Sequence, residues 1–256
     1  MYLSREEEGI YQGERGETLR RMMEILVALG DIFGAERLVS VRSVQIAGVS
    51  YKNIGEAGLK WISDLQGRVV VPSILNPAGM DLCRLLCQLG HWDAHQPRGR
   101  AVCPGGSAGG KTALYGYHQD DNQLPTHLVE VEADLRGSDY GALGFLMGKV
   151  VKDGVPFFRL KGQRPVPDEL KALGAAMAAS GSVALYYVEN VTPEPPGPWQ
   201  PVETICLGRK EIDEVYSQYT GEGANVVALG CPHCSGQELE KIAGLLKGQK
   251  VLIFSG

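Results

Sequence analysis

The stretch NVVALGCPHCSGQELEKIAGLL, residues 225–246, joins an apolar run, a Cys-Pro-His-Cys sequence and an amphipathic pattern. The apolar run predicts a strand, Gly230 predicts a tight turn, and apolar residues at helical spacing from Leu239 onward predict a helix that Ser235 or Gly236 can cap. In an α/β fold, the carboxyl end of a strand beside a helix N-terminus is where chemistry is placed, because unpaired N–H groups there favour a thiolate or an anion. The sulfur atoms of this stretch are expected at such a position.

Three kinds of function fit the two cysteines of this stretch. A thiol–disulfide oxidoreductase uses a C-x-x-C in a strand–turn–helix setting, with the helix stabilising the thiolate of Cys231 rather than Cys234. A zinc site needs a second pair, for which Cys83 and Cys87, one helical turn apart, are the candidates. An iron–sulfur site needs one or two of these sulfurs and cysteines from elsewhere in the chain. A pair of buried, inert thiols is the plain structural alternative.

The composition is that of a folded protein with one large domain or two small ones. The 256 residues are 44% hydrophobic and 21% charged, which is enough apolar material for a large core. A net charge of -5 gives no excess of positive charge, so neither nucleic acid nor a membrane surface is expected as a partner. No apolar run reaches the ~18 residues of a membrane span. Six cysteines suit metal or redox use in a reducing compartment, so a cytoplasmic location is expected.

Helical and strand patterns alternate along the rest of the chain. Ser4 predicts a helix cap, residues 18–29 predict a helix that Gly30 ends, and Met22 and Met23 are expected in the core. Further helices are predicted at 54–65, 82–89, 140–150, 168–180 and 209–219, and strands at 37–47, 69–71, 128–131, 156–160, 182–188 and 251–254. This alternation predicts an α/β fold, layered, with a largely parallel sheet and flanking helices.

The proline-rich sequence TPEPPGPWQP, residues 192–201, is the best candidate for a joint between domains. It separates a predicted first region, 1–191, from a second α/β region, 202–256, that contains the Cys-Pro-His-Cys sequence. The last predicted strand has no helix after it to cover it. The natural polypeptide is therefore expected to continue, or a partner is expected to cover this edge.

Residues 105–112 match the phosphate-binding pattern G-x-x-x-x-G-K-T, in which Lys111 would reach the terminal phosphates. Such a loop needs a strongly apolar strand before it and a long helix after it. Residues 98–102 are barely apolar, and the Tyr-Gly-Tyr sequence at 115–117 interrupts any helix at once. The pattern is therefore predicted not to be a nucleotide-binding loop.

Two other predicted turns have residues suited to bind a small acid. Gly48, Val49 and Ser50 follow a predicted strand, and their N–H groups and hydroxyl can hold an anion, although an ordinary turn is the commoner explanation. Asn76 precedes Pro77, an order that resists helix and favours a turn. Asn76 can therefore bind a ligand or simply cap that turn.

Five sequences together resemble the large subunit of the aconitase X family, dehydratases distantly related to aconitase. They occur in the family's order and cover most of the chain: VRSVQIAGVSYKNIGEAGL (41–59), ILNPAGMDL (74–82), LYGYHQDDNQ (114–123), VENVTPE (188–194) and VALGCPHCSGQEL (227–239). The resemblance implies an aconitase-like fold. It also implies dehydration of a small hydroxy acid, either mevalonate 5-phosphate, as in the mevalonate pathway of archaeal isoprenoid biosynthesis, or cis-3-hydroxy-L-proline, with the former favoured.

The resemblance also implies a cofactor and a partner. A 4Fe-4S cluster would accept the leaving hydroxyl as a Lewis acid, and Cys231 would be one of its ligands. Gly48, Val49, Ser50, Asn76 and Pro77 would line the substrate, and His118 would face the same cleft. A serine on a small subunit, in a heterodimer with this chain, would be the catalytic base, so no catalytic residue is assigned in this chain itself.

The chain also departs from the family pattern. Between the Asn-Pro-Ala-Gly-Met-Asp motif and the Gly-Tyr-His motif, the family has a Thr-Cys-Thr-Pro-Tyr motif that residues 90–100 replace with a shorter span. The second cluster ligand is therefore not identified, the third is expected beyond the last residue, and Gln123 stands where arginine is usual. One ligand cannot hold a cluster alone. The chain is thus predicted to lack an internal segment and a C-terminal part, with activity impaired.

Overall fold

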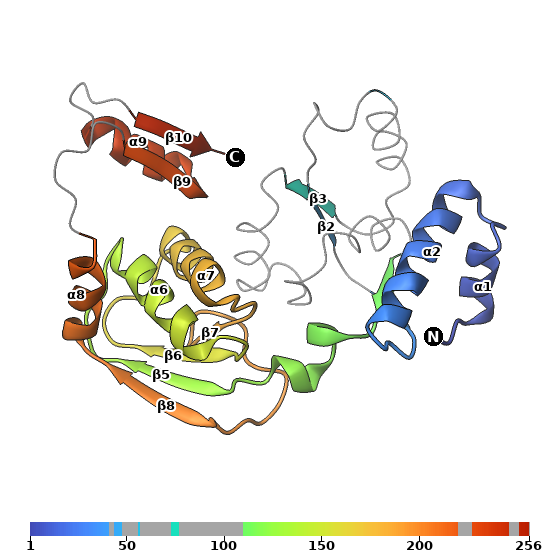
Figure 1. The fold of residues 1–256 in the computed structure, drawn as a ribbon, viewed down its shortest axis with the longest axis horizontal. Coiled ribbons are helices and arrows are strands. Elements are labelled where there is room, and N and C mark those ends of the chain that lie inside the picture. The colour runs from blue at the N-terminus through green and yellow to red at the C-terminus, as the bar shows by residue number, and fades with distance from the viewer. Residues whose placement is uncertain are drawn as a thin grey trace. The chain divides into compact units, whose positions relative to one another are not determined.

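The computed structural model describes residues 1–40, 44–47, 56, 73–76, 110–219, 227–245 and 251–255, with the backbone alone at 44–47, 73–76, 228, 230–233 and 251–255. These residues form two compact units that divide between Gln123 and Leu124. Figure 1 traces the elements of both units. The first unit contains all elements up to Gln123, and the second contains those from Leu124 onward.

Two helices open the first unit. They are α1 (Arg5–Tyr11) and α2 (Glu17–Ile32). Ser4 caps α1 as predicted: its hydroxyl accepts from the N–H of Glu7 at 3.4 Å, and the Glu7 carboxylate accepts from the N–H of Ser4 at 2.7 Å. The predicted last residue of the second helix, Leu29, is three residues short of the end of α2. Gly30 lies inside the helix, where its missing side chain makes room for Met1.

The strands of the first unit form two separate pairs. β1 (Leu38–Ser40) is antiparallel to β4 (Lys111–Ala113), and β2 (Val44–Ala47) is parallel to β3 (Ser73–Asn76). The single strand predicted at 37–47 is therefore two strands with different partners. The predicted strand at 69–71 and helix at 82–89 lie outside the described residues, as does the helix at 54–65 except for Glu56, which is helical.

Apolar side chains from α1, α2, β1 and β4 form the core of the first unit. The buried members are Ile10, Met23, Leu26, Ala35, Leu38 and Ala113. Met22 is also buried, so the prediction that both methionines fill the core is confirmed.

The second unit is built on a four-stranded parallel sheet in the order β7-β6-β5-β8. The strands are β5 (His127–Val131), β6 (Pro156–Leu160), β7 (Tyr187–Val188) and β8 (Glu203–Leu207). The helices that connect and follow them are α6 (Asp139–Val151), α7 (Pro167–Gly181) and α8 (Arg209–Ser217). Figure 1 shows α6 and α7 on the same face of this sheet.

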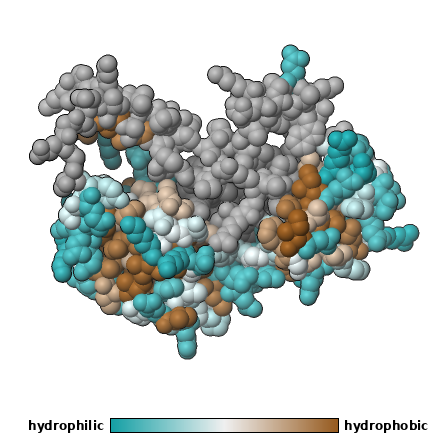
Figure 2. Space-filling view, viewed as in Figure 1, coloured by the Kyte–Doolittle hydropathy of each residue, from teal (hydrophilic) through white to brown (hydrophobic). Residues whose placement is uncertain are grey.

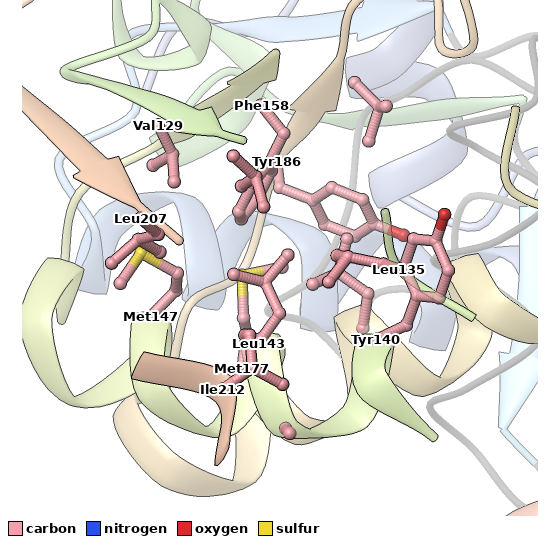
Figure 3. Packing of buried hydrophobic residues seen from close by; sticks show 14 of the residues in the cluster. Val129, Leu135, Tyr140, Leu143, Met147, Phe158, Met177, Tyr186, Leu207 and Ile212 are labelled. Atoms are coloured by element: carbon pink, nitrogen blue, oxygen red, sulfur yellow. The ribbon is translucent and has the colours of Figure 1, made fainter. Parts of the chain in front are cut away.

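The helix-covered face of the sheet contains the largest core of the chain. Figure 3 shows Val129, Phe158 and Leu207 from three strands pointing toward Leu143 and Met147 of α6. Tyr140, Met177, Tyr186 and Ile212 belong to the same cluster. The lack of a side chain at Gly144 allows helices α6 and α7 to approach closely. A Cβ at this position would lie only 2.9 Å from the Cβ of Ala176. At ~25 cal/mol per Å² of apolar area, this buried cluster is the main favourable term in the folding of the unit.

The opposite face of the sheet has an apolar row, with buried Phe157 and Tyr187 as register partners, and a polar row beside it. Side chains alternate along each strand, so Glu130, Arg159 and Cys206 lie on the face away from the core, at matching register positions of three strands. Arg159 donates to Glu130 at 2.7 Å and to Glu189 at 3.1 Å, which pairs the charges across the sheet. This polar alternation hid β8 from sequence reasoning, because Glu203–Leu207 lacks the apolar run of a fully buried parallel strand.

The apolar run at 182–188 is only partly a strand. Its first residues are buried, but only Tyr187 and Val188 pair with β6. Ser182 ends α7 in the left-handed region, with φ of 61°, and the run then crosses the core before it reaches the sheet. Tyr186 contributes there by donating a 2.8 Å hydrogen bond to the carbonyl of Leu170. Burial rather than sheet pairing therefore explains the apolar composition of this run.

A strand–helix–strand element completes the second unit: β9 (Val227–Cys234), α9 (Gly236–Leu245) and β10 (Val251–Ser255). β9 and β10 are parallel, which confirms the strands predicted at both positions. The α/β fold with a largely parallel sheet and flanking helices is confirmed as well. The proline-rich segment 192–201 packs on the sheet through Trp199, whose ring lies 4.9 Å from that of Phe157. The predicted domain joint there stays a prediction.

The surface of the described residues mixes apolar and polar side chains. Figure 2 shows hydrophobic colour where α2 and α6 lie in the view, with hydrophilic colour around it. Exposed apolar side chains on these helices are Ile25, Ile32 and Val150. Among the helices that the structure describes, none is both long and apolar enough to cross a lipid bilayer.

Candidate functional site

The predicted substrate turns of the first unit follow two paired strands. β2 and β3 run parallel, and their last residues, Ala47 and Asn76, are direct partners in the ladder. The carboxyl ends of parallel strands meet at one edge of a sheet, where α/β proteins bind ligands. Gly48, Val49, Ser50 and Pro77 come next in the chain but lie outside the described residues. Their contact with a substrate stays a prediction that this register supports.

His118 lies in a compact double turn formed by two short 3-10 helices, η1 (Gly116–His118) and η2 (Asp120–Gln123). Its ring lies edge-on to that of Tyr115 at 6.2 Å, and Tyr115 in turn stacks on Phe33 at 4.7 Å. This aromatic packing fixes the position of the imidazole within the first unit. A substrate contact by His118 stays a prediction.

Two other side chains of the same motif hold the double turn together. Asn122 donates to the carbonyl of Gly116 at 2.8 Å, and buried Gln123 donates to the carbonyl of Tyr117 at 2.8 Å. These bonds give both residues of this motif a structural role in the double turn. The glutamine that stands where the family usually has arginine is thus accommodated by a backbone hydrogen bond.

Of the glycine-rich sequence 105–112, the structure describes residues 110–112. Its last two residues, Lys111 and Thr112, lie in strand β4, opposite β1, whereas a phosphate loop would place them at the start of a helix. The ammonium group of Lys111 donates to the carboxylate of Glu7 at 2.6 Å instead. The prediction that the pattern is fortuitous is confirmed.

In the second unit, the Cys-Pro-His-Cys sequence forms a bulge near the carboxyl end of β9. Leu229 pairs with Ile253, and the next pair is Cys234 with Ser255, so β9 advances five residues while β10 advances two. The residues between Leu229 and Cys234 must therefore bulge out of the ladder. The predicted tight turn at Gly230 is corrected to this bulge, after which the strand resumes before α9 begins. The backbone of Cys231 lies in the bulge, and its side chain lies outside the described atoms.

Directly after the bulge, Ser235 caps α9, as expected for one of the two predicted caps. Its hydroxyl accepts from the N–H of Glu238 at 3.1 Å, and the Glu238 carboxylate accepts from the N–H of Ser235 at 2.7 Å. The hydroxyl of Ser235 also donates to Asp168, near the N-terminus of α7, at 2.6 Å. The end of β9 is thereby attached to the carboxyl edge of the four-stranded sheet, where α7 begins.

Lys171 completes this set of contacts. Its ammonium group donates to Glu238 at 2.6 Å and to Asp168 at 3.1 Å, and only 7% of its side chain is exposed. Together the four residues form a closed network, here called the α7–α9 ring: Asp168, Lys171, Ser235 and Glu238. Each member contacts two others, which satisfies the requirement that a buried charge be paired and hydrogen-bonded.

The electrostatics of the ring follow from these contacts. Burial alone would lower the pKa of Lys171, but the hydrogen bonds to Glu238 and Asp168 outweigh it and raise that pKa above its ordinary value. Burial likewise opposes the charge of Asp168, yet the bonds from Ser235 and Lys171 lower its pKa. Both shifts favour the charged forms of Lys171 and Asp168.

The same surroundings act on the neighbouring thiol. Burial raises the pKa of Cys234, and the negative charge of Glu238 raises it further. A disulfide oxidoreductase needs a thiolate stabilised near neutral pH at the N-terminal cysteine of the C-x-x-C, which is Cys231 here. The side chain of Cys231 lies outside the described atoms, so the pKa shift at Cys234 leaves the oxidoreductase interpretation untested.

The metal ligands are not brought together by the described residues alone. Cys83 and Cys87 lie outside them, and the described cysteines with side chains are Cys206, exposed on β8, and Cys234, half-buried. Among the residues that the structure describes, no group of three His, Cys, Asp or Glu side chains is placed to hold a metal ion. They do not fit a cluster by themselves, so no reaction step is derived through one.

Sequence reasoning missed the ring because it depends on residues far apart in the chain. Lys171 and Glu238 are separated by 67 positions. The Ser-x-x-Glu spacing at 235–238 does signal a capping box, and Asp168 and Lys171 share one helix turn. Nothing in the sequence joins these two local signals, which meet only through the packing of α7 against β9.

Comparison with known proteins places this fold and its motifs in one family. Residues 1–99 match the family model described as "Aconitase X first domain", and residues 125–217 match "Aconitase X second domain". The two matches together cover most of the chain. The chain belongs to the aconitase X family.

The relatives include four large subunits of phosphomevalonate dehydratase at 36–45% identity and a fifth, from Aeropyrum pernix, at 26%. The chain is 45% identical to the one from Methanosarcina mazei, across 98% of this chain and 77% of that protein, and 41% identical to the one from Methanothermobacter thermautotrophicus, across 98% and 78%. It is 27% identical to the cis-3-hydroxy-L-proline dehydratase of Pseudomonas aeruginosa, across 95% of this chain and 54% of that protein. These names confirm the prediction of a dehydratase subunit.

A solved structure agrees with the fold. The crystal structure of Thermococcus kodakaraensis aconitase X, in its holo-form, is 31% identical, with a TM-score of 0.74, and the match covers all of this chain and 81% of that one. The alignment with the Methanosarcina mazei protein runs over 309 positions, more than the 256 residues of this chain. Gaps in this chain therefore face residues of the relative, which agrees with the predicted internal shortening.

Proposed function

We propose that this chain is the large-subunit component of an aconitase-X-type hydro-lyase that dehydrates a small hydroxy acid, mevalonate 5-phosphate in preference to others. The observation that carries the choice is the difference in identity between two groups of dehydratases. Relatives named phosphomevalonate dehydratase large subunit reach 45% identity, whereas those named cis-3-hydroxy-L-proline dehydratase reach 27%. We propose a cytoplasmic location, as the cysteine usage suggests.

An iron–sulfur cluster is part of the proposal through the family resemblance. Hydroxide is a poor leaving group, and a cluster with an open iron position supplies a Lewis acid for it. Cys231 is the residue of this chain that would bind it, and the backbone of Cys231 lies in the β9 bulge beside α7 and α9. The remaining ligands have to come from residues that the structure does not describe or from outside this chain.

The substrate would contact the edge where β2 and β3 end. Backbone N–H groups at 48–50 and the side chain of Asn76 are suited to hold a carboxylate or phosphate, because such groups donate without adding a charge that must be paired. The base that removes the proton is proposed to come from a small subunit. The words "large subunit" in the names of the relatives support a partner of this kind.

The decisive experiment is anaerobic co-expression with the neighbouring small-subunit gene. The purified complex is analysed for iron and sulfide, and then incubated separately with mevalonate 5-phosphate and cis-3-hydroxy-L-proline while loss of water is followed by mass spectrometry. We expect iron in the complex and dehydration of the phosphorylated acid. Dehydration of hydroxyproline alone would move the assignment to the second group of relatives, and a complex at background iron would overturn the cluster proposal.

A Cys231→Ser variant tests the ligand assignment. We expect it to lose iron, while Cys206→Ser, which changes an exposed cysteine on β8, keeps the iron of the unchanged protein. Equal iron in both variants would remove Cys231 from the ligand set.

A further inference from the structure

The Cys-Pro-His-Cys bulge is held at both ends by different kinds of contact. On its N-terminal side, Val227, Ala228 and Leu229 pair in register with β10. On its C-terminal side, Cys234 pairs with Ser255, and the following Ser235 is bonded into the α7–α9 ring. A bulge interrupts ladder hydrogen bonds, so the sheet alone cannot fix its position.

We propose that the α7–α9 ring is a positioning device for this bulge, with Lys171 and Asp168 as its positioning residues. Two links cross from α7 to the β9–α9 segment: Lys171 to Glu238 at 2.6 Å, and Asp168 to Ser235 at 2.6 Å. Both links end on the capping box that directly follows Cys234. Whatever holds that capping box in place also sets where β9 ends and hence where the Cys231-bearing bulge lies.

The burial of the ring supports a positioning role over a chance surface contact. A lysine with 7% of its side chain exposed is uncommon unless it is paired, and here each carboxylate also bonds a second group of the ring. Such a closed set has one low-energy arrangement, because moving α9 away from α7 would break both links together. Paired strands β9 and β10 are too few to be stable by themselves, so their place depends on what they pack against.

The inference rests on the proposed function only for the role of the bulge, which is to place Cys231. Its test measures the position of the bulge directly. The thiol of Cys234 is half-buried beside the ring, and that of Cys206 is exposed on β8. The test compares the alkylation rates of these two thiols by iodoacetamide, read by peptide mass spectrometry, together with hydrogen exchange of the β9 amides. Cys206 acts as an internal reference because its surroundings do not include the ring.

The test variant is Asp168→Ala with Lys171→Met, which cuts both links and removes one charge of each sign. Its matched control is Glu132→Gln with Lys161→Met, which removes an exposed ion pair of 3.0 Å in the same unit. We expect the test variant to speed alkylation of Cys234 by about fivefold or more relative to Cys206, with faster exchange in β9. The control variant is expected to match the unchanged protein.

Asp168→Ala alone cuts one link and is expected to give an intermediate rate, which keeps the proposal testable if the double variant does not fold. Lys171→Arg keeps the charge and is expected to keep alkylation slow. An unchanged ratio of Cys234 to Cys206 alkylation in folded Asp168→Ala and double variants would overturn the proposal. Iron in the unchanged complex is measured alongside: its absence would count against the proposed function alone, since the alkylation ratio still decides the role of the ring.

Discussion

Both units contain a serine capping box whose glutamate is paired with a distant lysine, but the units differ in which member of the pair is buried. In each, the glutamate of a serine capping box also accepts from a distant lysine: Glu7 from Lys111 at 2.6 Å in the first unit, and Glu238 from Lys171 at 2.6 Å in the second. In the first unit the acid is the buried partner, with 6% of the Glu7 side chain exposed against 28% for Lys111. In the second unit the base is buried, with 7% exposed for Lys171 against 31% for Glu238.

This reversal decides which substitution is costly. Removing one partner of an ion pair is expensive mainly when the charge left behind is buried, since a half-exposed group regains water. Replacing the buried residue of such a pair is therefore expected to cost less stability than replacing its more exposed partner. Lys111 and the two acids of the ring are thus the sensitive positions, although they are the more exposed ones.

The largest effect is expected when both acids of the ring are neutralised. Asp168→Asn with Glu238→Gln leaves the ammonium group of Lys171 buried without an anionic partner, and we expect a loss of about 4 kcal/mol in the free energy of unfolding. Lys171→Met, which leaves two half-exposed acids, is expected to cost about 1 kcal/mol. Urea unfolding followed by circular dichroism measures both. Equal losses would show that burial of the remaining charge does not control the cost.

The second-largest effect is expected in the first unit, where replacing the lysine is expected to cost more stability than replacing the acid. Lys111→Met leaves the carboxylate of Glu7 buried and is expected to cost about 3 kcal/mol. Glu7→Gln keeps an acceptor for the cap and leaves a lysine that can reach water, so a loss of about 1 kcal/mol is expected. The same urea titrations compare them, and a larger loss for Glu7→Gln would break the proposed contrast between the units.

A smaller effect separates the two capping serines. Ser4→Ala removes a cap and is expected to cost about 1 kcal/mol. Ser235→Ala removes a cap and also the bond to Asp168, so its loss is expected to exceed that of Ser4→Ala by about 1 kcal/mol. Thermal unfolding of the two variants, each against the unchanged chain, provides the comparison. Identical melting temperatures would mean that the Asp168 bond contributes nothing measurable.

The pH dependence of stability gives the smallest effect. The pKa of Asp168 lies below its ordinary value of 3.8 and that of Glu7 below 4.5, after burial is outweighed by hydrogen bonds. Their contribution is therefore present above those ordinary values and is lost as pH falls through the lowered ones. Lys171, whose pKa is raised above 10.5, contributes below that value and loses its contribution as pH rises further.

The contribution of these three groups to the free energy of unfolding is accordingly expected to be constant between these limits. Lys171→Met is expected to remove part of the loss of stability at alkaline pH. Urea midpoints at a series of pH values test this. An alkaline loss that is the same with and without Lys171 would remove the ring from the pH dependence.

Sequence patterns predicted the elements whose apolar residues follow one clear period. Helix α2, in which buried Met22, Met23 and Leu26 recur at helical spacing, begins one residue before its predicted start. β8 escaped because its face with Cys206 is polar, and most of the run before Tyr187 proved to be buried chain rather than strand. Tertiary packing, not local preference, determined both outcomes.

The candidate site was predictable as motifs but not as contacts. Sequence reasoning placed Asn76 in a turn, whereas in the structure it is the last residue of β3 and pairs with Ala47 of β2. The link between Lys171 and Glu238 spans 67 positions and depends on α7 meeting β9, which no local pattern encodes. Thus the chemistry of single residues was readable from the sequence, whereas the network that positions Cys231 required the fold.

The bulge in β9 has a consequence for the history of this family. Because ladder pairing is complete on both sides of it, residues can be gained, lost or exchanged between Leu229 and Cys234 without shifting the register of either flanking pair. Sequence changes within the bulge can therefore alter the surroundings of Cys231 while the pairing of β9 with β10 is kept. Descendants of one ancestor could in this way acquire different hydroxy acids, or lose the reaction altogether, and still fold alike.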